Sequence, residues 1–148
     1  LRMDLQQQLS KEKVNVYQVN IQNHIIGIRV YGMLSMPKAP GKYPAVLRVP
    51  GAGVRPYKGD VKLAEKGIVV FEIGIHGIPV NLDSIVYENL RFGALLSYPT
   101  YNLDNRDEYY YKRVYLGCLR SVDFIFSLPC KNRSYFLRKN KRMGVPVN

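Results

Sequence analysis

The sequence predicts an α/β fold in which an antiparallel hairpin is followed by parallel strands joined by crossover helices. Three observations lead to this prediction. Alternating apolar and polar residues over 14–19 and again near 26–36 are separated by turn-forming residues. Apolar runs rich in β-branched residues at 45–49 and 68–73 flank a short helical segment, an order typical of parallel pairing with a right-handed crossover. Apolar residues then recur at steps of three and four over 111–125, which predicts a long amphipathic helix.

The length and composition fit one globular domain. The chain has 148 residues, of which 47% are apolar and 22% are charged, so a sizeable core can form and a disordered polymer is excluded. No stretch approaches the roughly 18 apolar residues that a membrane span needs. Cys118 and Cys130 are too few for the disulfide framework of a small secreted domain, so the redox compartment stays open.

The formal net charge of +11 is concentrated near the end of the chain. Residues 131–148 contain six basic residues and no acidic one, which leaves 16 basic and 11 acidic residues in 1–130. We therefore treat 131–148 as a basic tail, 14–130 as a partial α/β domain and 1–13 as a polar, loose lead-in. Basic residues without interleaved acids are suited to phosphate contacts. A non-catalytic module that binds nucleic acid or another polyanion through this tail is the alternative function.

Local signals place the remaining elements. Residues 60–66 predict a short helix that Gly67 stops, because glycine readily adopts the left-handed conformation past a helix end. Residues 74–103 contain several glycines and prolines and predict a long irregular segment, the kind of loop that often carries function. Asp104 is the expected N-cap of the long helix, and Pro129 ends it.

The turn Pro50-Gly51-Ala52-Gly53 is the first candidate site, since it follows a buried strand and precedes a helix. Glycines there let a ligand approach the backbone, whose free N–H groups can bind an anion. A dinucleotide-binding fingerprint would need a third glycine where Pro56 stands, and a phosphate-binding P-loop would need Gly-Lys-Ser/Thr. An oxyanion hole needs only one well-aimed N–H, and a tight turn without a ligand stays open.

His76, in Gly74-Ile75-His76-Gly77, is the second candidate, because it follows a strand end where open α/β sheets build their sites. A catalytic base would need a nucleophile and an orienting acid nearby, and a hydrogen-bonded structural histidine is the more common case. None of the seven serines lies in Gly-x-Ser-x-Gly, the strained elbow that exposes the nucleophile of a serine hydrolase on this architecture. Histidines and cysteines at unrelated spacings predict no metal site.

Several segments occur in a distinctive order after the hairpin. They are Tyr43-Pro44-Ala45-Val46-Leu47, Pro50-Gly51-Ala52-Gly53, Gly67-Ile68-Val69-Val70, and the helical segment that runs from Tyr109-Tyr110-Tyr111 through Val114-Tyr115-Leu116-Gly117-Cys118 to Arg120-Ser121-Val122-Asp123-Phe124. The helical segment is the most specific of these. In this order, over roughly residues 14–128, the chain resembles the acetyl xylan esterase / cephalosporin-C deacetylase family of α/β-hydrolases.

The resemblance implies a role for one residue. The third residue of the loop after the strand, Ala52 here, would donate its backbone N–H to an oxyanion hole. Gly51, Gly53 and His76, from the two candidate loops, are taken as candidate substrate contacts, although the family often has Arg-Gly-Gln-Gly where this chain has Gly74-Ile75-His76-Gly77. The segment 141–145 is similar to the beginning of the strand before the family's Gly-Gly-Ser-Gln-Gly-Gly elbow, and the sequence ends at Asn148 where that elbow would start.

The resemblance also implies an N-terminal portion of an α/β-hydrolase sheet, truncated before the nucleophile elbow. The complete enzyme would remove acetyl groups from acetylated sugars through a serine acyl-enzyme, assisted by a histidine and an acid. We expect the chain alone to be inactive, since all three catalytic residues would lie beyond it. A half-sheet would also leave an open strand edge and an apolar helix face, so we expect aggregation or dependence on a partner.

The resemblance sets the remaining expectations. The partner of the complete enzyme would be an acetylated carbohydrate or another small acetyl ester, with no cofactor and no metal. An oligomer stays open, while a membrane or nucleic-acid partner is not expected on this reading. No basic segment followed by an apolar one marks a signal peptide, so the compartment is left open between bacterial cytoplasm and periplasm.

Overall fold

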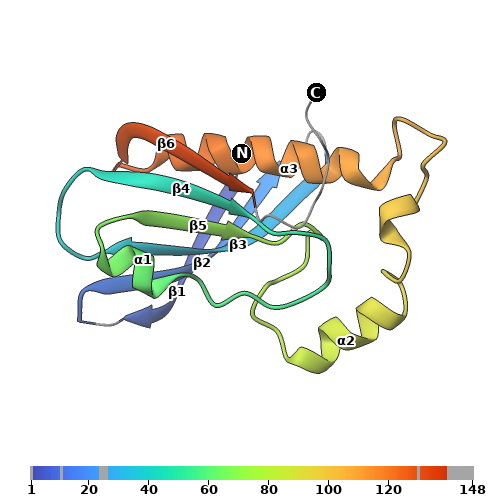
Figure 1. Cartoon of the computed structure of the whole chain (residues 1–148), viewed down its shortest axis with the longest axis horizontal. Helices are drawn as coiled ribbons and strands as arrows, with labels where there is room; N and C mark the ends of the chain where they lie inside the picture. Colours follow the sequence, from blue (N-terminus) through green and yellow to red (C-terminus); the bar gives the residue numbers. More distant parts are fainter. Residues whose placement is uncertain (1, 11, 24–26, 130, 140–148) are drawn as a thin grey trace.

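The computed structural model contains a single mixed sheet with helices on both of its faces (Figure 1). The structure describes residues 2–10, 12–23, 27–129 and 131–139. Its strands are β1 (Arg2–Ser10), β2 (Val14–Asn23), β3 (Ile28–Pro37), β4 (Tyr43–Val49), β5 (Val69–Ile73) and β6 (Lys131–Lys139). Its helices are α1 (Val61–Glu65), α2 (Ser84–Phe92) and α3 (Tyr110–Ser127), with a 3₁₀ turn η1 (Tyr98–Thr100).

The strand order β1-β2-β3-β5-β4-β6 confirms the predicted α/β fold. β2 and β3 form the expected antiparallel hairpin, with Val14 opposite Pro37. β4 and β5 are parallel, and their register places Arg48 opposite Glu72. β5 lies antiparallel to β3, so it joins the hairpin to the parallel part of the sheet.

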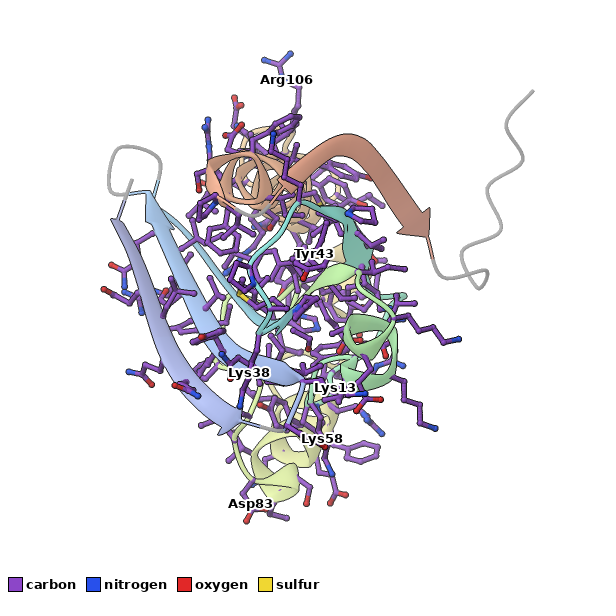
Figure 2. The ribbon with its side chains drawn as sticks, turned by 90° about the vertical axis from the view of Figure 1, so that its left-hand side faces the viewer. Lys13, Lys38, Tyr43, Lys58, Asp83 and Arg106 are labelled. Carbon is purple, nitrogen blue, oxygen red and sulfur yellow. The ribbon has the colours of Figure 1, made fainter. Side chains whose placement is uncertain are left out.

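Helices α3 and α1 cover opposite faces of this sheet (Figure 1). The α3 face is the larger core, where Phe124 packs on Phe71 with ring centroids 4.9 Å apart. The α1 face buries Ala64 against Val14 and Met33. Charged side chains such as Lys13, Lys58 and Arg106 lie at the exposed periphery (Figure 2). The two cores therefore fix the sheet from both sides.

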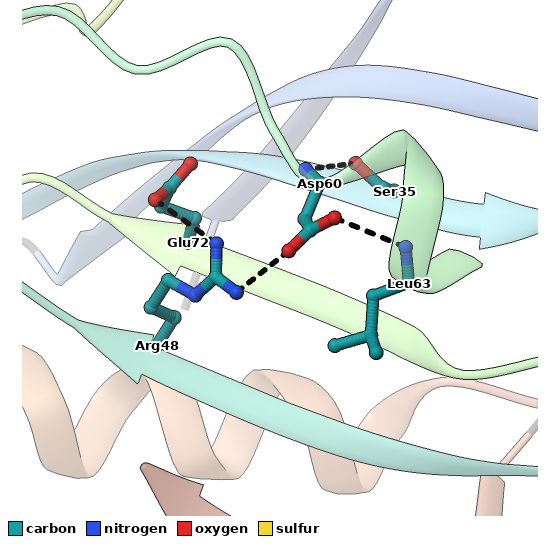
Figure 3. Close-up of polar contacts among 5 residues, drawn as sticks. All are labelled: Ser35, Arg48, Asp60, Leu63 and Glu72. Carbon is teal, nitrogen blue, oxygen red and sulfur yellow. Dashed lines mark hydrogen bonds and ion pairs between the residues drawn. The ribbon is translucent and has the colours of Figure 1, made fainter. Parts of the chain in front are cut away.

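An ion-pair network attaches α1 to the parallel strands (Figure 3). The Arg48 guanidinium lies 2.6 Å from the Asp60 carboxylate and 3.6 Å from that of Glu72. Asp60 also caps α1, because its side chain accepts from the Leu63 N–H at 3.0 Å, while its own N–H donates to Ser35 Oγ at 3.1 Å. Gly67, with φ +79°, ends α1 as predicted.

The structure corrects the expectation for residues 1–13. Arg2–Ser10 is the edge strand β1, which pairs antiparallel with β2 and contains a register shift between Gln7 and Leu9. The polar composition gave little sign of a strand because an edge strand gains its order from backbone hydrogen bonds rather than from burial. Leu5 is 51% exposed, which agrees with this reason.

The segment 74–103 is more ordered than its glycines and prolines indicated, since it contains α2 and η1. Asp83 caps α2 by accepting from the Ile85 N–H at 3.1 Å. The long helix α3 begins at Tyr110 rather than after Asp104, and 104–108 form turns. Asparagine and aspartate favour turns because their side chains bond nearby backbone groups, as Asn105 Oδ1 does with the Asp107 N–H at 3.0 Å.

The first half of the predicted basic tail is a strand. β6 is parallel to β4, with Val49 opposite Lys139, so it extends the parallel part of the sheet. The family-like segment 141–145 lies outside the described residues. A strand does begin after α3, therefore, but it occupies 131–139.

The outer face of α3 carries large apolar side chains. Tyr115, Leu119 and Phe126 are 63%, 59% and 44% exposed, so Tyr115 lies off the buried face although it falls within the apolar repeat of 111–125. The buried face includes Gly117 and Ser121, and the lack of a Cβ at Gly117 lets the helix approach Val30 of the sheet. Of the helices that the structure describes, none combines the length and apolar character that a bilayer span requires.

Candidate functional site

The candidate site lies where β4 and β5 end. Both strands are parallel, so the loops that follow them, 50–60 and 74–83, leave the same edge of the sheet. They run side by side, and the Tyr57 N–H donates to the Val80 carbonyl at 2.8 Å. All four predicted site residues therefore belong to one loop cluster.

Gly53 is held through both of its backbone polar groups. Its N–H donates to the Tyr98 hydroxyl at 2.8 Å, and its carbonyl oxygen lies 2.9 Å from Nε2 of His76. Tyr98 comes from η1 and is 4% exposed, and its ring meets the His76 ring edge-on at 4.7 Å between centroids. The loop after β4 is thus fastened to η1 and to the loop after β5.

The contacts of His76 fix its tautomer. The Gly53 carbonyl can only accept a hydrogen bond, so Nε2 carries the proton, and Nδ1, which lies 2.7 Å from the Tyr110 hydroxyl, accepts from it. Burial lowers the pKa of His76 below its usual 6.5, which keeps the imidazole neutral at pH 7. Burial also raises the pKa of Tyr110, so this hydroxyl keeps the proton that it donates. His76 is the hydrogen-bonded structural histidine that the sequence offered as the more common case.

Arg113 supports the other side of His76. It donates to the His76 carbonyl at 3.0 Å, and its guanidinium carbon lies 5.5 Å from the centre of the Tyr110 ring. Gly77 has φ +68°, and a Cβ there would collide with the Arg113 guanidinium and approach the Arg29 carbonyl at 3.1 Å. The glycine therefore lets arginine reach the backbone of the loop.

Two further arginines bind carbonyl groups of the loop after β4. Arg55 donates to the Ala52 carbonyl at 2.5 Å, and Arg91 of α2 donates to the Val54 carbonyl at 2.8 Å. Together with the His76 contact, three consecutive carbonyl oxygens, from residues 52 to 54, each face a side-chain donor. Each of these three carbonyl oxygens therefore already accepts a hydrogen bond from a side chain.

The N–H group of Ala52 differs from its neighbour. Ala52 is exposed, and within the described part of the chain its N–H has no hydrogen-bond partner, whereas the Gly53 N–H is bonded to Tyr98. Gly53 has φ +132°, a conformation that suits glycine, and this turns the chain directly after Ala52. An exposed residue whose N–H has no partner among the described residues therefore stands at the position predicted for the oxyanion hole.

The sequence missed Tyr98, Arg91 and Arg113, although Tyr98 and Arg91 lie in the long segment that it marked as functional. Tyrosines at helical spacing, such as Tyr110 and Tyr111, most often pack into a core. Tyr111 does belong to the core, at 9% exposed, but Tyr110 is half-buried and bonds His76. The feature of the sequence that could have drawn attention to Tyr98 is its position next to Pro99 inside a long loop.

Metal chemistry has no support in the described geometry. Across 2–10, 12–23, 27–129 and 131–139, no three His, Cys, Asp or Glu side chains lie close enough to share an ion. Burial raises the pKa of Cys118, which packs between two core clusters. Aromatic and basic side chains hold the backbone groups of the loops after β4 and β5.

A profile described as acetyl xylan esterase (AXE1) matches residues 2–136. The acetyl esterase Axe7A of Xylanibacter ruminicola is 38% identical over 105 residues, which cover 68% of this chain and 24% of that protein. This chain therefore spans about a quarter of that relative.

Solved structures show the same fold. Acetyl xylan esterase 1 from Thermoanaerobacterium sp. JW/SL YS485 superposes with a TM-score of 0.69 at 17% identity, covering 88% of this chain and 42% of its own. Acetyl xylan esterase from Paenibacillus sp. R4 gives 0.60 at 20% identity, covering 93% and 46%. The alternative of a polyanion-binding module is not supported by these relatives, all of which are named as acetyl or acetyl xylan esterases. The family profile and the identity to Axe7A establish that this chain belongs to the acetyl xylan esterase family.

Proposed function

We propose that this chain supplies the oxyanion-binding part of a serine esterase that removes acetyl groups from acetylated sugars. The observation that carries the proposal is the free, exposed N–H of Ala52 at the edge of the sheet where β4 and β5 end. The family membership supplies the reaction class, since the relatives are named as acetyl and acetyl xylan esterases.

The chemistry follows from where charge develops. Attack on an acetyl carbonyl gives a tetrahedral intermediate whose oxygen carries negative charge. A backbone N–H aimed at that oxygen stabilises the transition state, and losing one such donor typically costs about 10²–10³ in kcat. Ala52 would provide this donor, while Gly51 and His76 would line the space around the acetyl group.

The nucleophile, its histidine and the orienting acid would come from sequence that this chain does not contain. None of its serines lies in a Gly-x-Ser-x-Gly elbow, and both nitrogens of His76 are engaged by protein groups. The purified chain is therefore expected to show no turnover of a small acetyl ester. Turnover that a serine-directed inhibitor abolishes would contradict this division of the site.

A chimera tests the proposal directly. The matched segment of this chain would replace the corresponding segment of the Xylanibacter ruminicola acetyl esterase, and hydrolysis of acetylated xylan and of a chromogenic acetyl ester would be measured. We expect an active chimera, because the segment brings its own donor loop. An inactive chimera that melts as cooperatively as the parent esterase would contradict the proposal.

Two substitutions at Ala52 identify the donor. Ala52→Pro removes the N–H and should lower kcat by about 100-fold. Ala52→Gly keeps the N–H and should stay within a few-fold of the chimera. Equal activity of the two variants, at equal melting temperature, would show that another group binds the oxyanion.

A further inference from the structure

We infer that Tyr98 and His76 are positioning residues that clamp Gly53 through both of its backbone polar groups and thereby fix the loop conformation that presents the Ala52 N–H. The inference rests on the proposed function of Ala52. It assigns a role to two side chains that lie 22 residues apart in sequence and on different elements.

Two hydrogen bonds hold the backbone of Gly53. Its N–H points to the Tyr98 hydroxyl at 2.8 Å and its carbonyl to His76 Nε2 at 2.9 Å. A glycine with φ +132° has a wide range of alternative conformations, since it has no Cβ. Two hydrogen bonds to buried side chains remove that freedom, because Tyr98 and His76 are only 4% and 8% exposed.

The orientation of the carbonyl and N–H groups in this loop decides how it interacts with a developing negative charge. A carbonyl oxygen that faced the reacting acetyl group would repel the developing oxyanion, whereas an N–H would attract it. His76 holds the Gly53 carbonyl, Arg55 the Ala52 carbonyl and Arg91 the Val54 carbonyl. These three carbonyl oxygens and the Gly53 N–H are thus held by protein groups, while the Ala52 N–H has no partner among the described residues.

Residues of α3 hold both His76 and Tyr98 in place. Tyr110 donates to His76 Nδ1 at 2.7 Å, and Arg113 holds the His76 carbonyl at 3.0 Å, so α3 fixes the imidazole. Tyr98 packs against Tyr110 with centroids 5.1 Å apart. The clamp is therefore anchored to the long helix, and its two arms are coupled through Tyr110.

Tyr98→Phe and Tyr87→Phe form a matched pair for the test. Both hydroxyls accept a backbone N–H, from Gly53 at 2.8 Å and from Leu82 at 2.9 Å, and the two residues are 4% and 2% exposed. The Tyr87 hydroxyl also donates to the Pro79 carbonyl at 2.7 Å, so Tyr87→Phe should destabilise the protein at least as much. Only Gly53 belongs to the donor loop. In the active chimera, we expect Tyr98→Phe to lower kcat about tenfold with KM unchanged, while Tyr87→Phe stays within twofold at an equal or larger loss of melting temperature.

His76 is tested with a conservative and a disruptive variant. His76→Gln places an amide N–H near the Nε2 position and should retain much of the kcat. His76→Leu cannot donate to the Gly53 carbonyl and should lose at least tenfold. Equal losses in the two variants, or a Tyr98→Phe loss no larger than that of Tyr87→Phe, would overturn the positioning role.

A second readout separates this inference from the proposed function. Backbone amide NMR follows the loop without any catalysis, in the 148-residue chain carrying Leu119→Lys, which removes an exposed apolar side chain of α3 and so favours the monomer. Tyr98→Phe should shift the Gly53 and Ala52 amide signals, and Tyr87→Phe should leave them in place. Shifted signals together with an inactive chimera would reject the esterase function and retain the clamp, whereas unshifted signals would overturn the clamp even if the chimera were active.

Discussion

The Tyr98 hydroxyl accepts a hydrogen bond from the Gly53 N–H at 2.8 Å, although 45 residues separate the two in sequence. This bond joins the loop after β4 to the 3₁₀ turn η1. It occupies the N–H that follows that of Ala52 and so keeps this neighbouring donor away from a ligand. Gly53 itself has φ +132°, a conformation that glycine adopts more readily than other residues.

Gly53→Ala should therefore destabilise the protein. The backbone has φ +132°, and a Cβ would lie 2.6 Å from the Arg55 guanidinium, so strain should lower the free energy of unfolding by about 1–3 kcal/mol. Gly51→Ala is the control, because a Cβ there would have no atom within 4 Å, and it should change stability by less than about 1 kcal/mol. Urea unfolding of both variants measures the difference. Equal effects would show that the conformation of Gly53 is not constrained.

His76 predicts a specific dependence of stability on pH. Burial holds its pKa in the folded chain below the 6.5 of the unfolded chain, so the unfolded chain binds more protons as pH falls. The stability that the neutral imidazole contributes is complete above pH 6.5 and is lost as pH falls from 6.5 through the folded pKa. The free energy of unfolding at pH 7.5 and 5.5 should differ less in His76→Gln than in the original chain. An identical difference would contradict the assignment of a neutral, buried His76.

The fold could be predicted from sequence where burial gives the strands a regular pattern of apolar residues. Apolar residues on β2 and β3 alternate, and those of β4 and β5 form continuous runs, because these strands are buried by α1 or α3. β1 has no such pattern because it lies at the edge and is held by backbone pairing. The start of α3 was misplaced because acidic residues favour turns as well as first helical turns.

The sequence allowed us to predict which loops form the candidate site, but not which side chains from other elements contact these loops. Gly51, Ala52, Gly53 and His76 follow strand ends, and parallel strands bring such loops together by topology alone. Tyr98, Arg91 and Arg113 reach the loops from elements whose packing depends on the tertiary fold. No local pattern encodes a contact between residues 53 and 98.

Arg48→Met should weaken the attachment of α1. Burial by itself raises the pKa of Asp60, yet hydrogen bonds from the Leu63 N–H and from Arg48 outweigh it and lower that pKa. Removing Arg48 leaves two neighbouring carboxylates, Asp60 and Glu72, without their cation. We expect the free energy of unfolding at pH 7 to fall by about 1–2 kcal/mol, given that these side chains are partly exposed.

A surface ion pair provides the control for Arg48. Lys112 and Asp107 lie 2.8 Å apart but are 45% and 72% exposed, so Lys112→Met should cost less than about 0.5 kcal/mol. A double-mutant cycle with Asp60→Asn should give a coupling of about 0.5–1 kcal/mol between Arg48 and Asp60. Additive effects would show that the 2.6 Å pair contributes nothing to stability.

The apolar outer face of α3 should make the isolated chain self-associate. Tyr115 and Leu119 are one helical turn apart and 63% and 59% exposed, so they form apolar surface that water covers poorly. Leu119→Lys breaks this surface and places a cation four residues before Asp123, and it should raise the monomer fraction several-fold in sedimentation velocity. Leu103→Lys is the matched control, because Leu103 is 64% exposed but lies outside α3. Equal improvement by both lysines would attribute the effect to added charge, and a monomeric original chain would contradict the prediction.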